Sequence, residues 1–231
     1  MKPLGAILAG GQSLRYGAPK ALAEVGGRRI IDRVVDALGT ACDDLVLIAN
    51  DPDLFRDLDL PTRPDLRPGL GALGGIHTAL VTADEQGRPG IVAVACDMPF
   101  LSVPLLARLR DVAFAGGGGP PGPIAGGPAA GPAVDVRPDL VVPESRSRRG
   151  VEPLCAAYGT GCIPAIEAEF DRGDSHVIGF YDDVRVHRLA LGEVEALCDP
   201  ERAFLNVNTT GERDRAERLA GGEAEGSSRA D

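Results

Sequence analysis

The sequence has 231 residues, and its 34 acidic side chains outnumber its 24 lysines and arginines to give a formal net charge of −10. A chain of this length forms one large α/β domain or two small ones. The negative charge argues against partners that are nucleic acids or anionic membranes, and a chain without tryptophan has few rings on which single-stranded bases could stack.

The spacing of the cysteines and histidines argues against a disulfide framework or a zinc site. The five cysteines are scattered and never form a C-x-x-C pair, and the three histidines form no H-x-x-x-H pattern. Free thiols are typical of a reducing compartment, so we expect a cytoplasmic protein. No apolar stretch is long enough to span a bilayer.

Short apolar runs alternate with amphipathic runs through the first half of the chain. The apolar runs predict buried strands at residues 4–9, 44–50 and 91–95. The amphipathic runs predict helices at 28–40 (closed by Gly39), 74–87 and 102–114, the last with Ser102 as its N-cap and Pro104 in its first turn. This order predicts an α/β fold: a Rossmann-like, doubly wound, mostly parallel sheet with helices on both faces.

The second half of the chain resumes the pattern after a segment that cannot form a core. Residues 116–132 are almost entirely Gly, Pro and Ala, which predicts a mobile insert. Further elements are expected within 133–143, 152–158, 162–173, 184–191 and 204–221. The polar, acidic residues 220–231 are expected to form a disordered tail, which leaves residues 1–219 as a single domain.

The segments that follow the predicted strands carry the candidate site. Ligands of open parallel sheets bind beyond the carboxyl ends of the strands. Gly10 and Gly11 follow the first strand, and backbone N–H groups at glycines can approach phosphate oxygens closely. Arg15 and Lys20 add positive charge to the same loop. Asp97 follows the third strand, where Mg²⁺ bridging it to phosphates would compensate a costly carboxylate.

The loop differs from two well-known phosphate-binding loops. It is not G-x-G-x-x-G, which disfavours a Rossmann dinucleotide site. It is also not G-x-x-x-x-G-K-[ST], because Ala21 follows Lys20 where a hydroxyl is required. Each residue alone has an ordinary interpretation as a turn or a surface charge. Together, at one end of one sheet, they favour a triphosphate–metal site.

The loop "LAGGQSLRYGAPKAL" (8–22) resembles the signature L-A-G-G-x-S-x-R-M-G-x-x-K of the molybdenum cofactor guanylyltransferase family, within the nucleotidyltransferase superfamily. Tyr16 stands where that signature has methionine. Four further motifs match in order: "RPDLRPGLGALGGI" (63–76), "CDMPFL" (96–101), "EPLCAAY" (152–158) and "FLNVNT" (204–209). The resemblance spans the chain apart from the insert and the tail.

The resemblance implies a nucleotide-diphospho-sugar transferase-like fold and a reaction of GTP with a molybdopterin-type cofactor. The terminal phosphate of the cofactor attacks the α-phosphorus of GTP and pyrophosphate leaves, so the enzyme acts by positioning and charge neutralisation. It also implies transient contact with the proteins that supply and accept the cofactor, and Mg²⁺ as the metal.

The same resemblance implies a role for each site residue. Catalysis falls to Arg15, Lys20 and Asp97, with Asp97 as the ligand of Mg²⁺. The nucleotide is bound by Leu8, Ala9, Gly10, Gly11, Lys20, Asp65 and Asp97. The acceptor is bound by Asn206 and Asn208.

Three alternatives stay open. A cytidylyltransferase acting on the same cofactor typically has L-A-A-G in the first loop, so Gly10 favours guanine. Another NTP-dependent nucleotidyltransferase, such as one acting on sugar 1-phosphates, is more distant because those chains run longer. A non-catalytic nucleotide-binding protein would be expected to lack Asp97 or Lys20, and both are present.

Overall fold

The computed structural model describes residues 2–10, 22–115 and 137–227. Its strands are β1 (Leu4–Leu8), β2 (Glu24–Val25), β3 (Arg28–Arg29), β4 (Leu45–Ile48), β5 (Thr62–Arg63), β6 (Gly90–Ala95), β7 (Leu140–Pro143), β8 (Cys155–Gly159) and β9 (Val186–Leu189). Its α-helices are α1 (Ile30–Ala41), α2 (Gly71–Glu85), α3 (Val103–Phe114), α4 (Ile163–Asp171), α5 (Leu191–Leu197), α6 (Pro200–Ala203) and α7 (Thr210–Ser227). Short 3₁₀ turns lie at Pro52–Leu58, Thr160–Cys162 and Tyr181–Asp183.

Seven of these strands form one sheet in the order β5-β4-β1-β6-β8-β7-β9. β8 pairs antiparallel with both of its neighbours, and the remaining pairs are parallel. The prediction of a mostly parallel sheet is therefore confirmed. The chain adds β4 on one side of β1 and β6 on the other, so the strand order reverses at β1.

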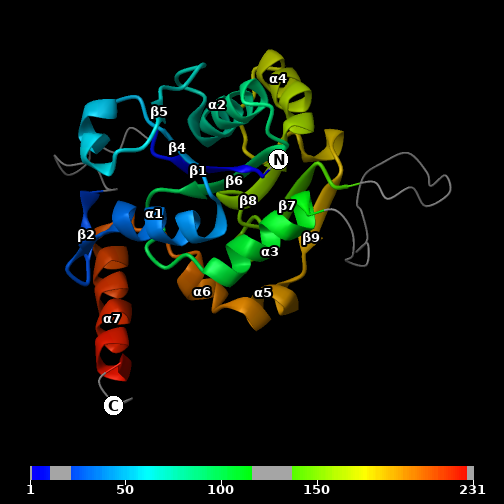
Figure 1. The fold of residues 1–231 in the computed structure, drawn as a ribbon. Coiled ribbons are helices and arrows are strands. Elements are labelled where there is room, and N and C mark those ends of the chain that lie inside the picture. The colour runs from blue at the N-terminus through cyan, green and yellow to red at the C-terminus, as the bar shows by residue number, and fades with distance from the viewer. Residues whose placement is uncertain (1, 11–21, 116–136, 228–231) are drawn as a thin grey trace.

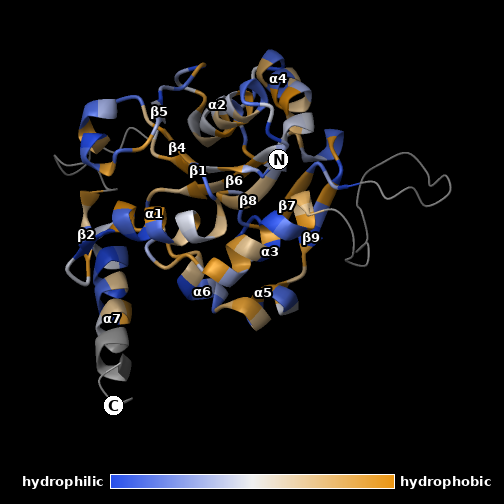
Figure 2. Cartoon of the chain, viewed as in Figure 1, coloured by the Kyte–Doolittle hydropathy of each residue, from blue (hydrophilic) through white to orange (hydrophobic). Residues whose placement is uncertain are grey.

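Two layers of helices cover the sheet (Figure 1). Strand side chains alternate between the layers: Val92 and Val94 of β6 pack in the core with α1 and α3, whereas Ile91 and Ala93 pack in the core with α2 and α4. Figure 2 shows the central strands in hydrophobic colours, as expected for strands buried on both faces. The doubly wound arrangement with helices on both faces is confirmed.

Two helix boundaries differ from those expected. α1 continues past Gly39 to Ala41 and ends where the Cys42 amide donates a hydrogen bond of 2.8 Å to the Leu38 carbonyl. α2 begins at Gly71, which has φ of +58° and stands where the loop turns into the helix. The expected N-cap of α3 is present, because the Ser102 hydroxyl accepts a hydrogen bond from the Leu105 amide at 3.3 Å.

The C-terminal helix α7 extends beyond the expected end of the domain. Thr209 and Glu212 form a capping box at its start, in which each side chain accepts a hydrogen bond from the other residue's amide. The helix then runs to Ser227, eight residues beyond the domain end at 219 that the sequence predicts. Alanine and glutamate favour helix, and no proline follows to end it. The Gly26 amide of the β2–β3 hairpin donates to the Glu217 carboxylate at 2.9 Å.

Two further expectations concern the Gly/Pro-rich insert and membrane-spanning segments. The Gly/Pro-rich insert at 116–132 lies outside the described residues. Across the described part of the chain, no helix combines the length and the apolar character needed to cross a membrane.

Candidate functional site

Three backbone hydrogen bonds hold together the segments that leave the carboxyl ends of the parallel strands. The Ala9 amide donates to the carbonyl at the end of β4 at 2.8 Å, and the Cys96 amide donates to the Leu8 carbonyl at 3.1 Å. The Ala49 amide donates to the carbonyl at the end of β5 at 2.9 Å. The residues that follow β1, β4, β5 and β6 therefore emerge at one edge of the sheet, where its strand order reverses.

Asp65 is fixed at this edge by a reciprocal pair of hydrogen bonds with Asn50. The Asn50 amide group donates to Asp65 Oδ2 at 2.8 Å, and the Asp65 backbone amide donates to Asn50 Oδ1 at 2.9 Å. The second oxygen, Asp65 Oδ1, is buried and has no hydrogen-bond partner within the described ranges. A buried acceptor without a partner is costly, so a donor from a ligand would be favourable here.

Gly10 allows the chain after β1 to pass directly against this carboxylate. A Cβ atom at position 10 would lie 3.0 Å from Asp65 Oδ2 and 3.7 Å from Asp65 Cγ. That first distance is shorter than nearly all real Cβ contacts, so a side chain at position 10 would displace Asp65. Gly10 and Asp65, far apart in sequence, thus form one surface.

The loop that carries Asp65 is anchored to the helix behind it. The Leu66 amide donates to the Thr78 hydroxyl at 3.0 Å, and this hydroxyl donates to the Gly74 carbonyl at 3.0 Å. The Arg67 guanidinium lies over the Phe170 ring, 5.3 Å from its centre. These contacts attach the loop to α2 and α4 and fix the position of Asp65.

Asp97 lies directly beyond β6, and the acceptor motif is attached to its backbone. The Val207 amide donates to the Asp97 carbonyl at 3.0 Å, which brings residues 206–208 beside Asp97. Asn206 donates through its side chain to the Phe204 carbonyl at 3.2 Å, and the Asn208 amide donates to Glu212 at 2.8 Å. The structure therefore joins, through a backbone hydrogen bond, the segment expected to bind the metal and the segment expected to bind the acceptor, which are far apart in the sequence.

Glu152 is a further acidic residue at this edge, and the sequence analysis gave it no role. Val94 pairs with Cys155, and the Ala95 amide donates to the Leu154 carbonyl at 2.9 Å, so the segments that carry Asp97 and Glu152 leave neighbouring strands at the same edge of the sheet. Glu152 is only 8% exposed. Burial raises the pKa of its carboxyl group, a hydrogen bond from the Leu154 amide and the charge of Arg149 lower it, and the charge of Asp97 raises it further.

Mg²⁺ fits the donor set at this edge. The described part of the chain has no group of three or more His, Cys, Asp or Glu side chains that could hold a metal ion. Mg²⁺ is typically held by one or two carboxylates together with phosphate oxygens and water. The carboxyl groups of Asp97 and Glu152 are of the kind that this requirement names.

Three expected site residues cannot be placed by the structure. Gly11, Arg15 and Lys20 fall within 11–21, outside the described residues. Leu8 ends β1, and Ala9 and Gly10 follow it directly at the site.

The cysteines have the properties of core residues rather than of nucleophiles. Burial raises the pKa of Cys42 to about 11 and that of Cys162 to about 12, and it also raises the pKa of Cys155. Cys96 packs against the hydrophobic core. A covalent thiolate intermediate is disfavoured by these environments.

A mostly parallel sheet of this strand order, with glycine and carboxylates at its reversal point, defines an α/β protein of the nucleotidyltransferase type. Residues 5–184 match the family described as MobA-like NTP transferase domain. This match covers more than half of the chain, and the chain belongs to that family.

Two relatives are similar over nearly their whole length. The chain is 34% identical over 214 residues to the molybdenum cofactor guanylyltransferase of Desulfosudis oleivorans, covering 92% of this chain and 93% of that one. It is 30% identical over 221 residues to the molybdenum cofactor guanylyltransferase of Cereibacter sphaeroides, covering 95% and 97%.

Two crystal structures share the fold. Molybdopterin-guanine dinucleotide biosynthesis protein A of Archaeoglobus fulgidus matches with a TM-score of 0.71 at 22% identity, covering 95% of this chain and 99% of that one. The 4-diphosphocytidyl-2C-methyl-D-erythritol synthase of Anaerococcus prevotii matches with a TM-score of 0.60 at 16% identity, covering 94% and 96%. The nucleotide-diphospho-sugar transferase-like fold expected from the sequence is confirmed.

Proposed function

We propose that this protein transfers GMP from GTP to the terminal phosphate of the molybdopterin cofactor and releases pyrophosphate. The observation that carries the proposal is the 34% identity to a molybdenum cofactor guanylyltransferase over 92% of this chain. In the reaction, an oxygen of the acceptor phosphate bonds to the α-phosphorus of GTP. The bond from that phosphorus to the bridging oxygen of the pyrophosphate breaks at the same centre.

The chain's task in this reaction is to bring two anions together. Asp97 holds Mg²⁺, which supplies positive charge to the phosphate oxygens when it is bound. The segment 206–208 is attached to Asp97, so Asn206 and Asn208 are suited to position the acceptor beside the α-phosphate. No group of the protein needs to become covalently attached to the nucleotide.

The nucleotide is proposed to bind along the surface that Gly10 and Asp65 form. The backbone of Leu8, Ala9 and Gly10 faces the GTP, and Asp65 Oδ1 is a buried acceptor that an N–H or O–H group of the nucleotide would satisfy. Gly11, Arg15 and Lys20 are proposed to hold the leaving phosphates. This assignment of Gly11, Arg15 and Lys20 rests on the sequence motif alone.

The setting of the reaction follows from the same assignment. We expect brief contacts with the proteins that deliver the cofactor and receive the product. We also expect the reaction to take place in the cytoplasm, where buried reduced thiols such as Cys42 and Cys155 are ordinary.

A cytidylyltransferase is the second candidate, because an enzyme named for a cytidylyl product shares the fold. The discriminating experiment compares GTP, CTP and ATP, each with Mg²⁺, in thermal unfolding and in transfer to the molybdopterin acceptor. At a concentration of 100 times the dissociation constant, the preferred nucleotide stabilises the protein by about 2.7 kcal/mol. We expect GTP to give the largest shift in Tm and the highest incorporation. Equal shifts or preferred CTP incorporation would refute the guanine assignment.

A further inference from the structure

Glu152 is a buried carboxylate for which the chain supplies no ion-pair partner among the residues that the structure describes. It is 8% exposed, and its side chain accepts a hydrogen bond from the Leu154 amide at 3.2 Å. Its environment includes a second negative charge, that of Asp97. A buried carboxylate is costly unless a cation or several donors compensate it. Among the described residues, the charge of Arg149 acts on Glu152 but forms no ion pair with it, so a further cation would be favourable here.

The backbone around Glu152 is held on both sides, so its position is set before any ligand binds. The Glu152 amide donates to the Pro143 carbonyl at 3.0 Å, and the Cys155 amide donates to the Glu152 carbonyl at 3.2 Å. The Ala95 amide donates to the Leu154 carbonyl at 2.9 Å, which carries the β6–β8 pairing one step towards Asp97. This bonding fixes the backbone of Glu152 at the edge of the sheet where Asp97 also leaves its strand.

We propose that Glu152 is a second carboxylate ligand of the Mg²⁺ that Asp97 holds. The proposal rests on the proposed function, since it takes from it the metal at Asp97. Mg²⁺ bound by two carboxylates and by phosphate oxygens is a common arrangement, and it demands near-ideal geometry. A rigid second carboxylate would hold the ion in one position relative to the α-phosphate.

The test measures metal binding rather than turnover. Mn²⁺ replaces Mg²⁺ as the probe, and its binding is followed by electron paramagnetic resonance, first with Mn²⁺ alone and then with a GTP analogue that has a methylene group between the α- and β-phosphorus. Glu152→Gln keeps the shape of the side chain and the oxygen that accepts from Leu154. We expect Glu152→Gln to weaken Mn²⁺ binding by about tenfold or more.

Two control variants separate the possible failures. Asp171→Asn removes one negative charge from an exposed position at the end of α4, and we expect its Mn²⁺ affinity to equal that of the wild type. Asp97→Asn should abolish Mn²⁺ binding. If Asp97→Asn binds Mn²⁺ normally, the metal assignment within the proposed function is wrong. If Asp97→Asn loses Mn²⁺ and Glu152→Gln keeps wild-type affinity, the role of Glu152 alone is overturned.

A second variant covers the case in which Glu152→Gln does not fold. Glu152→Asp retains the charge but shortens the side chain by one methylene group. Because Mg²⁺ and Mn²⁺ sites depend strictly on ligand position, we expect Glu152→Asp to bind Mn²⁺ several-fold more weakly. Wild-type affinity in a folded Glu152→Asp protein would overturn the proposal.

Discussion

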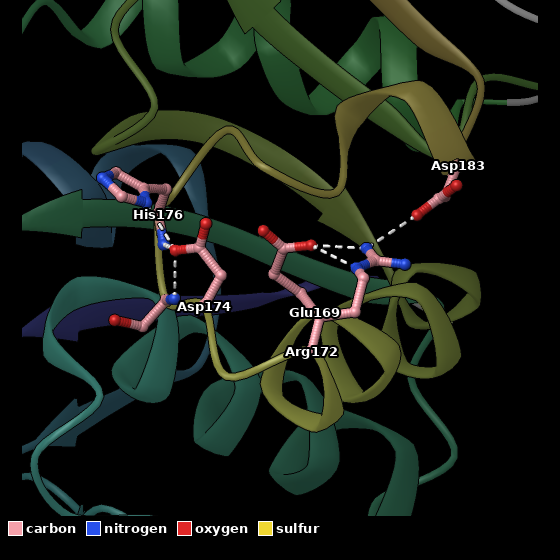
Figure 3. Close-up of polar contacts among 6 residues, drawn as sticks. Glu169, Arg172, Asp174, His176 and Asp183 are labelled. Carbon is pink, nitrogen blue, oxygen red and sulfur yellow. Dashed lines mark hydrogen bonds and ion pairs between the residues drawn. The ribbon is translucent and has the colours of Figure 1, made fainter.

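Glu152 and Glu169 are two carboxylates of similar burial with different surroundings. Glu169 of α4 is 4% exposed and accepts a hydrogen bond from Arg172 Nε at 3.0 Å and a second one from Arg172 Nη2. Figure 3 shows this pair, with Arg172 also reaching Asp183 at 3.0 Å. The carboxylate of Glu169 packs against Gly179, where an added Cβ atom would force this carboxylate to move. Glu152, in contrast, forms no ion pair with a described residue, and the negative charge of Asp97 acts on it.

The difference separates a structural carboxylate from one placed for a ligand. Glu169 has its cation three residues along the same helix end, so its charge is compensated in the folded chain itself. Glu152 forms no ion pair with any described residue, and it lies at the sheet edge where substrates with several phosphates are expected to bind. A buried acid without an ion-pair partner among the described residues is therefore more informative than a buried acid that has one.

The largest effect is expected for Asp97→Asn. Loss of the metal-holding charge should lower kcat by at least about 100-fold, as for removal of other groups that stabilise transition-state charge. The hydrogen bond from the Val207 amide to the Asp97 carbonyl is a backbone contact that the substitution keeps, so this contribution to the free energy of unfolding should not change. Initial rates of pyrophosphate release, together with a denaturant titration, check both parts. A variant with normal turnover would remove Asp97 from the mechanism.

The second-largest effect is expected for Glu169, the carboxylate that has an arginine partner. Arg172→Ala leaves the Glu169 carboxylate buried and without its partner, which should lower the free energy of unfolding. The half-exposed position of Arg172 makes this loss smaller than for a fully buried pair. Urea unfolding followed by circular dichroism measures it. The KM for GTP should stay at the wild-type value, and a changed KM would contradict a purely structural role.

Glu152→Gln should have the opposite effect on stability. It removes a buried negative charge that has an acidic neighbour, so the metal-free protein should unfold at the same or a higher urea concentration than the wild type. Added Mn²⁺ should then stabilise the variant less than it stabilises the wild type. A variant destabilised as strongly as Arg172→Ala would show that Glu152 is a structural residue like Glu169.

The smallest effect is expected for the pH dependence of stability that comes from Asp139, a carboxylate paired with Arg185. Asp139 accepts from Arg185 Nε at 2.8 Å and from Nη2 at 2.7 Å, and these hydrogen bonds hold the pKa of Asp139 below its usual 3.8. The unfolded chain thus binds a proton at higher pH than the folded chain does, so the pair stabilises the fold above pH about 4. This stabilisation is lost as the pH falls through the folded pKa. Arg185→Gln should flatten the acid limb of a stability-against-pH curve, and an unchanged limb would contradict the assignment.

The sequence predicted the parts of the fold that have long periodic patterns. Strands β1, β4 and β6 and helices α1 and α3 were expected within a few residues, because burial on both faces of a sheet and on one face of a helix leaves clear periods. β2, β3 and β5 have only two residues each, too few for any period to appear. A glycine often marks the end of a helix, but α1 continues past Gly39 to Ala41 because of packing that the sequence pattern does not reveal.

The sequence allowed prediction of those site residues that closely follow a predicted strand. Asp97 and Gly10 each follow a strand directly, so their place at one edge could be inferred from the parallel sheet. The clamp between Asn50 and Asp65 depends on β5 lying next to β4, and the position of Glu152 depends on β8 running antiparallel. Neither fact can be read from hydrophobic periodicity, because strand direction and register are set by tertiary packing.

The hydrogen bond from Val207 to Asp97 joins the segment proposed for the acceptor to the one proposed for the metal through main-chain atoms alone. Substitution of the side chains at positions 206 and 208 would therefore leave this main-chain connection in place. Under the proposed function, the contacts to the acceptor could change during evolution while the segment proposed for the metal keeps its backbone position.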